Sequence, residues 1–140
     1  MATFVLTDAT VSINSVDLSD RVQSVSIDYS AEMQDDTTMG AGTRTMIPGL
    51  LNYTIEVQMV QDFASAEVDD TLFSLVGAVA FPIAIRPTSA AISATNPEFQ
   101  GNVIIESYPP LGNTVGEIAT TTVMFRPSGA SPTLLRDVTP

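Results

Sequence analysis

The sequence predicts a mainly β protein: an antiparallel β-sandwich or partly open barrel with one flanking α-helix, a long hairpin loop and extended terminal arms. Three observations lead to this prediction. Several stretches alternate apolar and polar residues, a single stretch at 61–78 repeats its apolar residues at helical spacing, and turn-forming residues separate these stretches. A chain of 140 residues is long enough to bury a core, so we expect one domain spanning 1–140.

Two long strands carry the clearest pattern. In residues 24–30 and again in residues 52–59, every second side chain is apolar, from Val25 to Tyr29 and from Tyr53 to Met59. Successive side chains of a strand point to opposite faces, so the intervening polar residues share one face of a hairpin. We expect that face to remain in water. Its residues are Ser24, Ser26, Asp28, Ser30, Asn52, Thr54, Glu56 and Gln58.

A polar segment at 34–45 (QDDTTMGAGTRT) connects these two strands. It is too long for a tight hairpin turn, and loops of this length within a domain are usually functional or disordered. Gly40 and Gly42 give it flexibility. We expect the loop to project from the end of the hairpin, with Pro48-Gly49 turning the chain into the second strand.

The segment 61–78 is the one predicted helix. Its apolar residues recur on one face of a 3.6-residue period: Val68, Leu72, Leu75 and Val76. This face is expected to cover the core. Asp62 or Ser65 is expected to cap the start of the helix, Asp69 and Asp70 suit the positive end of its dipole, and Gly77 is expected to end it.

Shorter elements complete the chain. We expect a small hairpin at 10–18 turning at Asn14-Ser15, and further strands at 81–85, 99–108 and 118–125. Pro82 indicates either an edge strand or the beginning of a strand, because proline has no amide hydrogen to donate. Residues 1–8 and 127–140 are expected to be terminal arms, the second ordering only against a partner.

Composition excludes several classes of function. The chain has no Cys and no His, which removes the Ser/His and Cys/His nucleophile systems and the usual transition-metal ligands. The net charge of −11 disfavours binding to nucleic acid or to an anionic membrane, although an acidic surface would let DNA slide past without sticking. The first residues lack the pattern of a secretory signal, and no apolar run is long enough to span a bilayer.

No motif predicts a catalytic, metal or cofactor site. The acidic pairs Asp35-Asp36 and Asp69-Asp70 do not lie in the frame of a calcium loop. The glycines at 40 and 42 are not followed by the lysine of a phosphate-binding loop, and the triplet beginning at Asn52 lies in a predicted strand. A two-carboxylate hydrolase therefore ranks last among the functions considered, and we expect a protein that is not an enzyme and uses no cofactor.

The predicted elements instead favour self-assembly. The predicted hairpin has a polar face, and the chain also has two arms and a long loop. Such a chain has unpaired strand edges and extended ends, which monomeric proteins normally protect. In an assembly the edges pair between neighbours and the arms and loops contact adjacent subunits.

The chain resembles the major tail tube proteins of long-tailed, non-contractile bacteriophages and related prophages, over about residues 10–128. The resemblance is one of overall pattern. It is carried by the stretches Ala31–Thr37, Ile47–Leu50, Gln61–Ala64, Asp70–Phe73, Arg86–Ala90, Asn96-Pro97 and Glu106–Tyr108.

This resemblance implies a β-sandwich subunit that forms hexameric rings, which stack into a hollow tube. It implies that the long hairpin lines an acidic channel through which DNA passes without specific binding, with Asp28 and Glu56 on the channel side among the other polar residues of the two strands. The implied partners are further copies of the chain together with tape measure, tail terminator and distal tail proteins, in the virion tail and, during assembly, in the host cytoplasm. The loop residues expected to contact the next ring are Gln34, Asp35, Asp36, Thr37, Thr38, Met39 and Arg44.

Two alternatives remain at this point. One is another structural part of the virion, such as a minor tail, tail-completion or capsid decoration protein. The other is a β-sandwich adhesion module, which is disfavoured by the absence of Trp and the small number of Tyr, since sugar sites and interface hot spots depend on aromatic side chains.

Overall fold

The computed structural model describes residues 3–129 and 133–139. Its strands are β1 (Thr10–Ile13), β2 (Val16–Asp17), β3 (Val22–Asp35), β4 (Met46–Val60), β5 (Phe81–Arg86), β6 (Glu98–Ser107), β7 (Thr120–Pro127) and β8 (Leu135–Asp137). The helical elements are the 3-10 turn η1 (Ser19–Arg21), the α-helix α1 (Val68–Leu72) and the 3-10 turn η2 (Phe73–Leu75). The mainly β prediction with a single flanking helix is confirmed.

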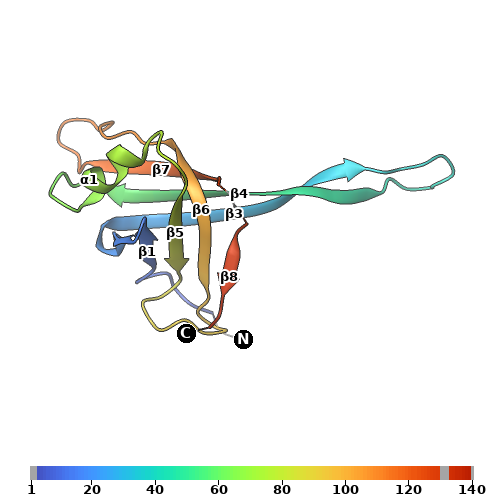
Figure 1. Cartoon of the computed structure of the whole chain (residues 1–140), viewed down its shortest axis with the longest axis horizontal. Helices are drawn as coiled ribbons and strands as arrows, with labels where there is room; N and C mark the ends of the chain where they lie inside the picture. The colour runs from blue at the N-terminus through green and yellow to red at the C-terminus, as the bar shows by residue number, and fades with distance from the viewer. Residues whose placement is uncertain (1–2, 130–132, 140) are drawn as a thin grey trace.

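All strands belong to one antiparallel sheet in the order β2-β1-β5-β6-β7-β4-β3, with β8 pairing β6 as well. The sheet folds back on itself at β6, which pairs with β5 on one side and with β7 and β8 on the other. Figure 1 shows β3, β4 and β7 running along the long axis, while β1, β5, β6 and β8 cross them steeply. This is the near-orthogonal packing of a sandwich whose corner is made by one shared strand.

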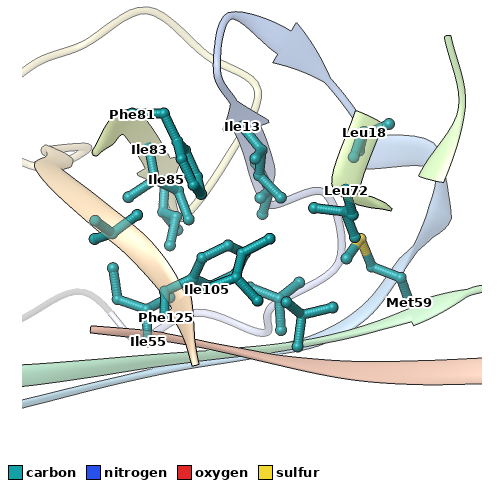
Figure 2. Packing of buried hydrophobic residues seen from close by; sticks show 14 of the residues in the cluster. Ile13, Leu18, Ile55, Met59, Leu72, Phe81, Ile83, Ile85, Ile105 and Phe125 are labelled. Carbon is teal, nitrogen blue, oxygen red and sulfur yellow. The ribbon is translucent and has the colours of Figure 1, made fainter. Parts of the chain in front are cut away.

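The core lies between these two layers. Ile55, Val57, Met59, Val123 and Phe125 face inward from β4 and β7. They meet side chains from the crossing strands and from α1, several of which are visible in Figure 2: Ile13, Leu18, Leu72, Phe81, Ile83, Ile85 and Ile105. The alternation seen in the sequence thus separates a buried face from a wet one, as expected for an amphipathic sheet.

The predicted helix is much shorter than 61–78. Ala66 has a positive φ of 61°, a backbone conformation that no α-helix contains, so the helix begins only at Val68 with Glu67 as its N-cap residue. Asp62 and Ser65 were wrongly expected to cap it; the Asp62 carboxylate instead accepts a hydrogen bond from the Ala64 amide at 2.9 Å in the preceding turn. Asp69 and Asp70 do lie in the first turn, and the chain turns at Gly77 with φ of 78°, as predicted.

Of the helical face expected to cover the core, Val68 and Leu72 are buried and Leu75 is partly buried. Val76 is half exposed, because it follows the end of η2 in an extended conformation. The short helix is held to the rest of the molecule by polar contacts: Tyr108 donates a hydrogen bond to Asp69 at 2.7 Å, and the Gln61 amide donates to the Tyr108 oxygen at 3.0 Å.

Smaller elements differ in detail from the prediction. The first hairpin turns at Asn14 and Ser15, both with positive φ, as expected. Pro82 is the second residue of β5, so it does mark the beginning of a strand, but β5 lies between β1 and β6 and is not at the edge. The predicted arms include residues 1–2, 130–132 and 140, which lie outside the described residues. In the C-terminal segment, β8 pairs with β6 of the same chain, in contrast to an arm that orders only against a partner.

Candidate functional site

The eight polar residues predicted to line a channel lie on one face of the β3–β4 hairpin. The register pairs them directly across the two strands as Ser24 with Gln58, Ser26 with Glu56, Asp28 with Thr54 and Ser30 with Asn52. Residues directly opposite each other in an antiparallel pair point to the same side. We call this surface, together with its continuation on β7, the polar face.

The polar face is wider than the hairpin. Strand β7 pairs with β4 so that Thr122 lies opposite Gln58 and Met124 opposite Glu56. The next residue of this row is Arg126, whose guanidinium donates hydrogen bonds to Thr54 Oγ1 at 3.0 Å and to Glu106 Oε2 at 2.8 Å. Arg126 therefore links β4, β7 and β6 on the side that carries Asp28 and Glu56.

Thr122, Met124 and Arg126 were not predicted from the sequence as part of this face. Residues 120–126 alternate between inward and outward side chains, and the same period-two argument applied to β7 would have found them. Arg126 lay outside the predicted strand because that strand (118–125) ended two residues before β7 ends at Pro127, and strand ends are difficult to place from sequence alone.

Beyond Tyr53 the hairpin leaves the body of the molecule. Figure 1 shows β3 and β4 continuing together far past the crossing strands. Tyr53 is the last buried residue of β4 on this path, and every residue from Met46 to Asn52 is exposed. We call residues 31–51 the distal hairpin. It carries large apolar side chains that are about half exposed or more: Met33, Met39, Met46, Ile47, Leu50 and Leu51.

Pro48 and Gly49 do not form the predicted turn; both lie within β4. The register changes from Ala31 opposite Leu51 to Met33 opposite Pro48, so two residues of β4, Gly49 and Leu50, face one residue of β3. This is a β-bulge. A side chain at Gly49 would approach the backbone oxygen of Glu32 to 3.2 Å, a tight contact that favours glycine at this position.

The connecting loop is shorter than predicted, because Gln34 and Asp35 belong to β3 and the turn occupies 36–45. The base of the loop is closed by polar contacts: Thr45 Oγ1 donates to Asp36 Oδ1 at 2.7 Å, and the Thr45 amide donates to Thr37 Oγ1 at 2.9 Å. The other predicted contact residues, Thr38, Met39 and Arg44, lie at the exposed end.

Electrostatics at the base of the loop follow from the same geometry. The Thr37 hydroxyl and the Thr37 backbone amide both hydrogen-bond to the Asp35 carboxylate, the amide at 2.9 Å from Oδ1. These hydrogen bonds hold the pKa of Asp35 below its usual range. The Arg44 guanidinium lies 3.4 Å from the Asp35 carboxylate, but its side chain is 83% exposed, so most of its donor groups point into water.

Across residues 3–129 and 133–139, no cluster of Asp and Glu side chains is arranged to hold a metal ion. Within the same residues, no helix has the length and apolar character needed to cross a bilayer. Two extended surfaces have been described so far: the polar face and the distal hairpin.

No protein-family model matches the sequence, and a search of curated proteins finds no match. Solved structures do match the fold. A chain in the virion of a native gene transfer agent particle is similar with a TM-score of 0.71 at 15% identity, over 92% of this chain and 95% of that one. A chain of the SPP1 tail tube is similar with a TM-score of 0.70 at 12% identity, over 94% of this chain and 77% of that one. The chain has a tail-tube fold.

The same fold occurs in other parts of such particles. A chain in the sheath/tube terminator of an extracellular contractile injection system has a TM-score of 0.70 at 16% identity, with 98% of each chain covered. A chain in the cap that terminates the tube of the anti-feeding prophage has a TM-score of 0.67 at 12% identity, over 99% of this chain and 95% of that one. Chains with this fold are therefore found in structures of tube ends as well as in structures of tubes.

Proposed function

We propose that this chain is a structural subunit of a phage tail tube, which assembles into stacked hexameric rings around a channel for DNA. The observation that carries the proposal is the two-sided wall formed by β3, β4 and β7. One side is buried against the second layer, and the other is a continuous polar face with Asp28 and Glu56 exposed on it.

The fold supports this proposal. The match to the SPP1 tail tube covers most of both chains, and a chain of a gene transfer agent tail refined with C6 symmetry is similar with a TM-score of 0.61. A ring of six such walls would place the polar faces around one axis. DNA carries a dense row of phosphates, so an acidic wall would repel it weakly along its whole length and let it slide.

The unpaired edge of β3 supports assembly. Strand β3 ends the sheet order, so within the described residues only β4 pairs with it. Long unprotected edges of this kind favour association with another chain. In the tube, pairing at this edge would have to outweigh the repulsion between copies that each carry a net charge of −11.

The partners proposed are further copies of the chain and, at the ends of the tube, tape measure, terminator and distal tail proteins. The location would be the virion tail, reached from the host cytoplasm where assembly takes place. No enzymatic step is needed for this function.

Negative-stain electron microscopy of the purified protein over a range of concentrations tests the proposal. We expect hollow tubes of uniform width with a regular axial repeat. Discrete single rings would instead favour a terminator or completion protein, a second candidate that the match to the terminating cap supports. A monomer at all concentrations that binds a carbohydrate or protein saturably would favour the adhesion module and contradict the tube.

A further inference from the structure

The sandwich is open along β3. Figure 1 shows the ends of β5 and β6 extending past this strand, which is the last of the sheet order. A groove of about 350 Å³, which we call the β3 groove, lies in the opening and has a size common among binding sites. Tyr29 and Phe4 are 49% and 61% exposed there, so apolar surface is left uncovered. The groove is lined mainly by apolar side chains, including Phe4, Leu6, Ile27, Tyr29, Ile85 and Phe99.

Arg86 is the one charged residue among the described residues that line the β3 groove. Its Nη1 donates to the Ala90 carbonyl at 3.1 Å, and its buried Nε lies 3.4 Å from Glu98 Oε2 without forming a hydrogen bond. A guanidinium carries five N–H donors, so most donors of Arg86 have no acceptor within the described residues. The β3 groove therefore suits an apolar segment that brings one further carboxylate.

A segment of this chemistry lies on the other side of the wall. The loop between β6 and β7 lies on the β7 side, and β4 separates β7 from β3 (Figure 1). We call residues 111–118 of this loop the β6–β7 tip. Leu111 and Ile118 are 75% and 66% exposed, and Val115 is fully exposed. Glu117 is the one charged residue of the tip, and its exposed carboxylate has no hydrogen bond or ion pair within the described residues.

The β6–β7 tip is held in place from both sides. On one side, Gln61 Nε2 donates to the Pro110 carbonyl at 2.8 Å. On the other, the Thr120 amide donates to Asn113 Oδ1 at 2.9 Å. A segment that is already ordered loses less conformational entropy when it docks. The tip is therefore prepared to present its apolar side chains and Glu117 to a partner.

From these observations we propose that the β3 groove of one copy receives the β6–β7 tip of a second copy beside it in the same ring. Leu111, Val115 and Ile118 pack on the apolar lining of the groove. Glu117 accepts hydrogen bonds from the free donors of Arg86. The inference rests on the proposed function and deepens it by naming the two surfaces that join neighbours within a ring.

The placement of the two surfaces on opposite sides of the wall favours a second copy as the partner. A groove and a tip that differ from each other form a heterologous contact, which closes into a ring when the rotation between copies allows it. The same contact brings β3 of one copy toward the β7 side of the next, so the polar faces continue around the ring. Closure leaves no groove and no tip free, which limits the number of copies joined in this way.

Cysteine crosslinking tests the contact, because the chain contains no cysteine of its own. Thr7→Cys, next to Leu6 of the groove, is combined with Thr114→Cys in the tip; both positions are exposed and both leave the proposed contact residues in place. The matched control combines Thr7→Cys with Thr38→Cys, an exposed position in the loop of the distal hairpin. Each full-length protein is treated with a flexible bis-maleimide under assembly conditions and examined on a denaturing gel.

We expect the test pair to give a ladder of covalent oligomers that ends at the hexamer, and the control pair to give none. A mixture of the two single-cysteine proteins should stop at dimers, because each copy then has one reactive position. A ladder from the control pair alone would show that the groove receives the distal hairpin, and a test-pair ladder that continues past the hexamer would show a contact that does not close. Either result would overturn the proposal.

Variants of the tip test the side chains. Glu117→Arg should raise the concentration needed for assembly about tenfold or more, as the loss of a charge pair in an interface does. Asp20→Arg makes the same change at an exposed acid in η1 and is the matched control. Val115→Asp should also weaken assembly, whereas Val79→Asp, at a position 87% exposed outside the tip, should not. Equal effects of test and control variants would contradict docking by the tip.

The pairing of Arg86 with Glu117 is tested by combining their substitutions. In the Arg86→Gln background, Glu117→Gln should change the assembly threshold much less than it does in the wild type, because the donors it serves are gone. Additive effects would contradict the pairing. Circular dichroism checks that Arg86→Gln folds; if it does not, the crosslinks and the tip variants still decide the proposal.

Electron microscopy of the crosslinked samples distinguishes failure of this inference from failure of the tube. Tubes that form without any test-pair crosslink would refute docking in the groove and leave the tube intact. Crosslinked rings that never stack would support the groove contact and contradict the tube. The absence of both would refute both.

Discussion

The phenol of Tyr53 lies against Gly101 across the two layers of the sandwich. A side chain at position 101 would overlap the Tyr53 hydroxyl oxygen, and that hydroxyl donates a hydrogen bond to the neighbouring Asn102 carbonyl at 3.3 Å. The Tyr53 ring also meets the Tyr29 ring edge to face, with centroids 6.5 Å apart. Because Tyr53 is the last buried residue before the distal hairpin, this contact anchors the hairpin to the body.

Replacing Gly101 with alanine should therefore destabilise the subunit by about 1–3 kcal/mol, because the added methyl group must displace a packed ring. Chemical denaturation of the monomer measures the change. Gly112→Ala is the matched control, since nothing lies within 4 Å of its added carbon and its φ is not positive. Equal stability of the two variants would show that the Tyr53 ring moves away at no cost.

Arg126→Gln should weaken assembly more than it weakens folding. Arg126 and Glu106 are 40% and 44% exposed, so the loss of their ion pair should cost the subunit less than about 1 kcal/mol. Each ring, however, would carry one more uncompensated negative charge per copy on the polar face. We expect a higher concentration threshold for assembly, with the difference shrinking as salt is added.

Arg136→Gln is the control for that experiment. It removes the same charge, but Arg136 contacts the Ala94 carbonyl at 3.3 Å and extends from β8, outside the polar face. If both variants shift the threshold equally, total charge and not the position of Arg126 determines assembly.

Asp28→Arg combined with Glu56→Arg tests which surface faces DNA. Both side chains are exposed on the polar face, so the double variant should still fold and form tubes. Arginine pairs with phosphate, so DNA should stick in the channel and infectivity should fall, while Asp28→Asn with Glu56→Gln should have a milder effect. Normal infectivity of phage particles that carry the arginine variant would show that this face does not line the channel. Ala94→Arg with Thr95→Arg adds arginines in the loop between β5 and β6 and serves as the control.

Deleting residues 37–43 should stop ring stacking and leave the subunit folded. Asp35 opposite Met46 is the last strand pair, so the deletion leaves a three-residue connection, a length that hairpins accept. Circular dichroism and electron microscopy report folding and assembly separately. A Gly/Ser replacement of the same length distinguishes loss of reach from loss of specific side chains. Unchanged tubes after the deletion would show that the loop is not a stacking element.

Alkaline pH should loosen the attachment of α1. Burial raises the pKa of Tyr108 to about 12 from a reference of 10.0, and the neighbouring Asp69 acts in the same direction. The neutral phenol is thus favoured in the folded state, so its contribution is complete below pH 10 and is lost as pH rises toward 12. Melting temperature as a function of pH should fall more steeply for the wild type than for Tyr108→Phe in this range, and parallel curves would contradict the assignment.

Much of the fold could be predicted because the pattern that decides it is local. Period-two alternation correctly separated the eight polar residues from the buried side chains between Tyr53 and Met59 and from the partly buried Val25 and Ile27, although Tyr29 is half exposed. Gly77 and the turn at Asn14-Ser15 were predictable because their backbone conformations restrict the residue type.

The errors arose where tertiary structure overrides local preference. Pro48-Gly49 has the composition of a turn, but pairing with β3 holds both residues in a strand and absorbs the extra residue as a bulge. The helix was overextended because Asp62 hydrogen-bonds within a turn and Ala66 adopts a positive φ, neither of which follows from helical periodicity. Arg126 was not predicted because the expected strand ended at residue 125, and its contacts with Thr54 and Glu106 join strands far apart in the sequence.

The bulge at Gly49 and Leu50 determines which side chains of β4 accompany the polar residues beyond Asn52. With the extra residue, Ile47 lies opposite Gln34 and shares its face, while Met46 and Pro48 point to the other side. Without it, strand alternation would turn Met46 and Pro48 to the side of Asn52. One inserted residue thus changes which side chains lie on a given face partway along a strand. Deleting position 49 would move Met46 and Pro48 to the side of Asn52 and Ile47 to the opposite side.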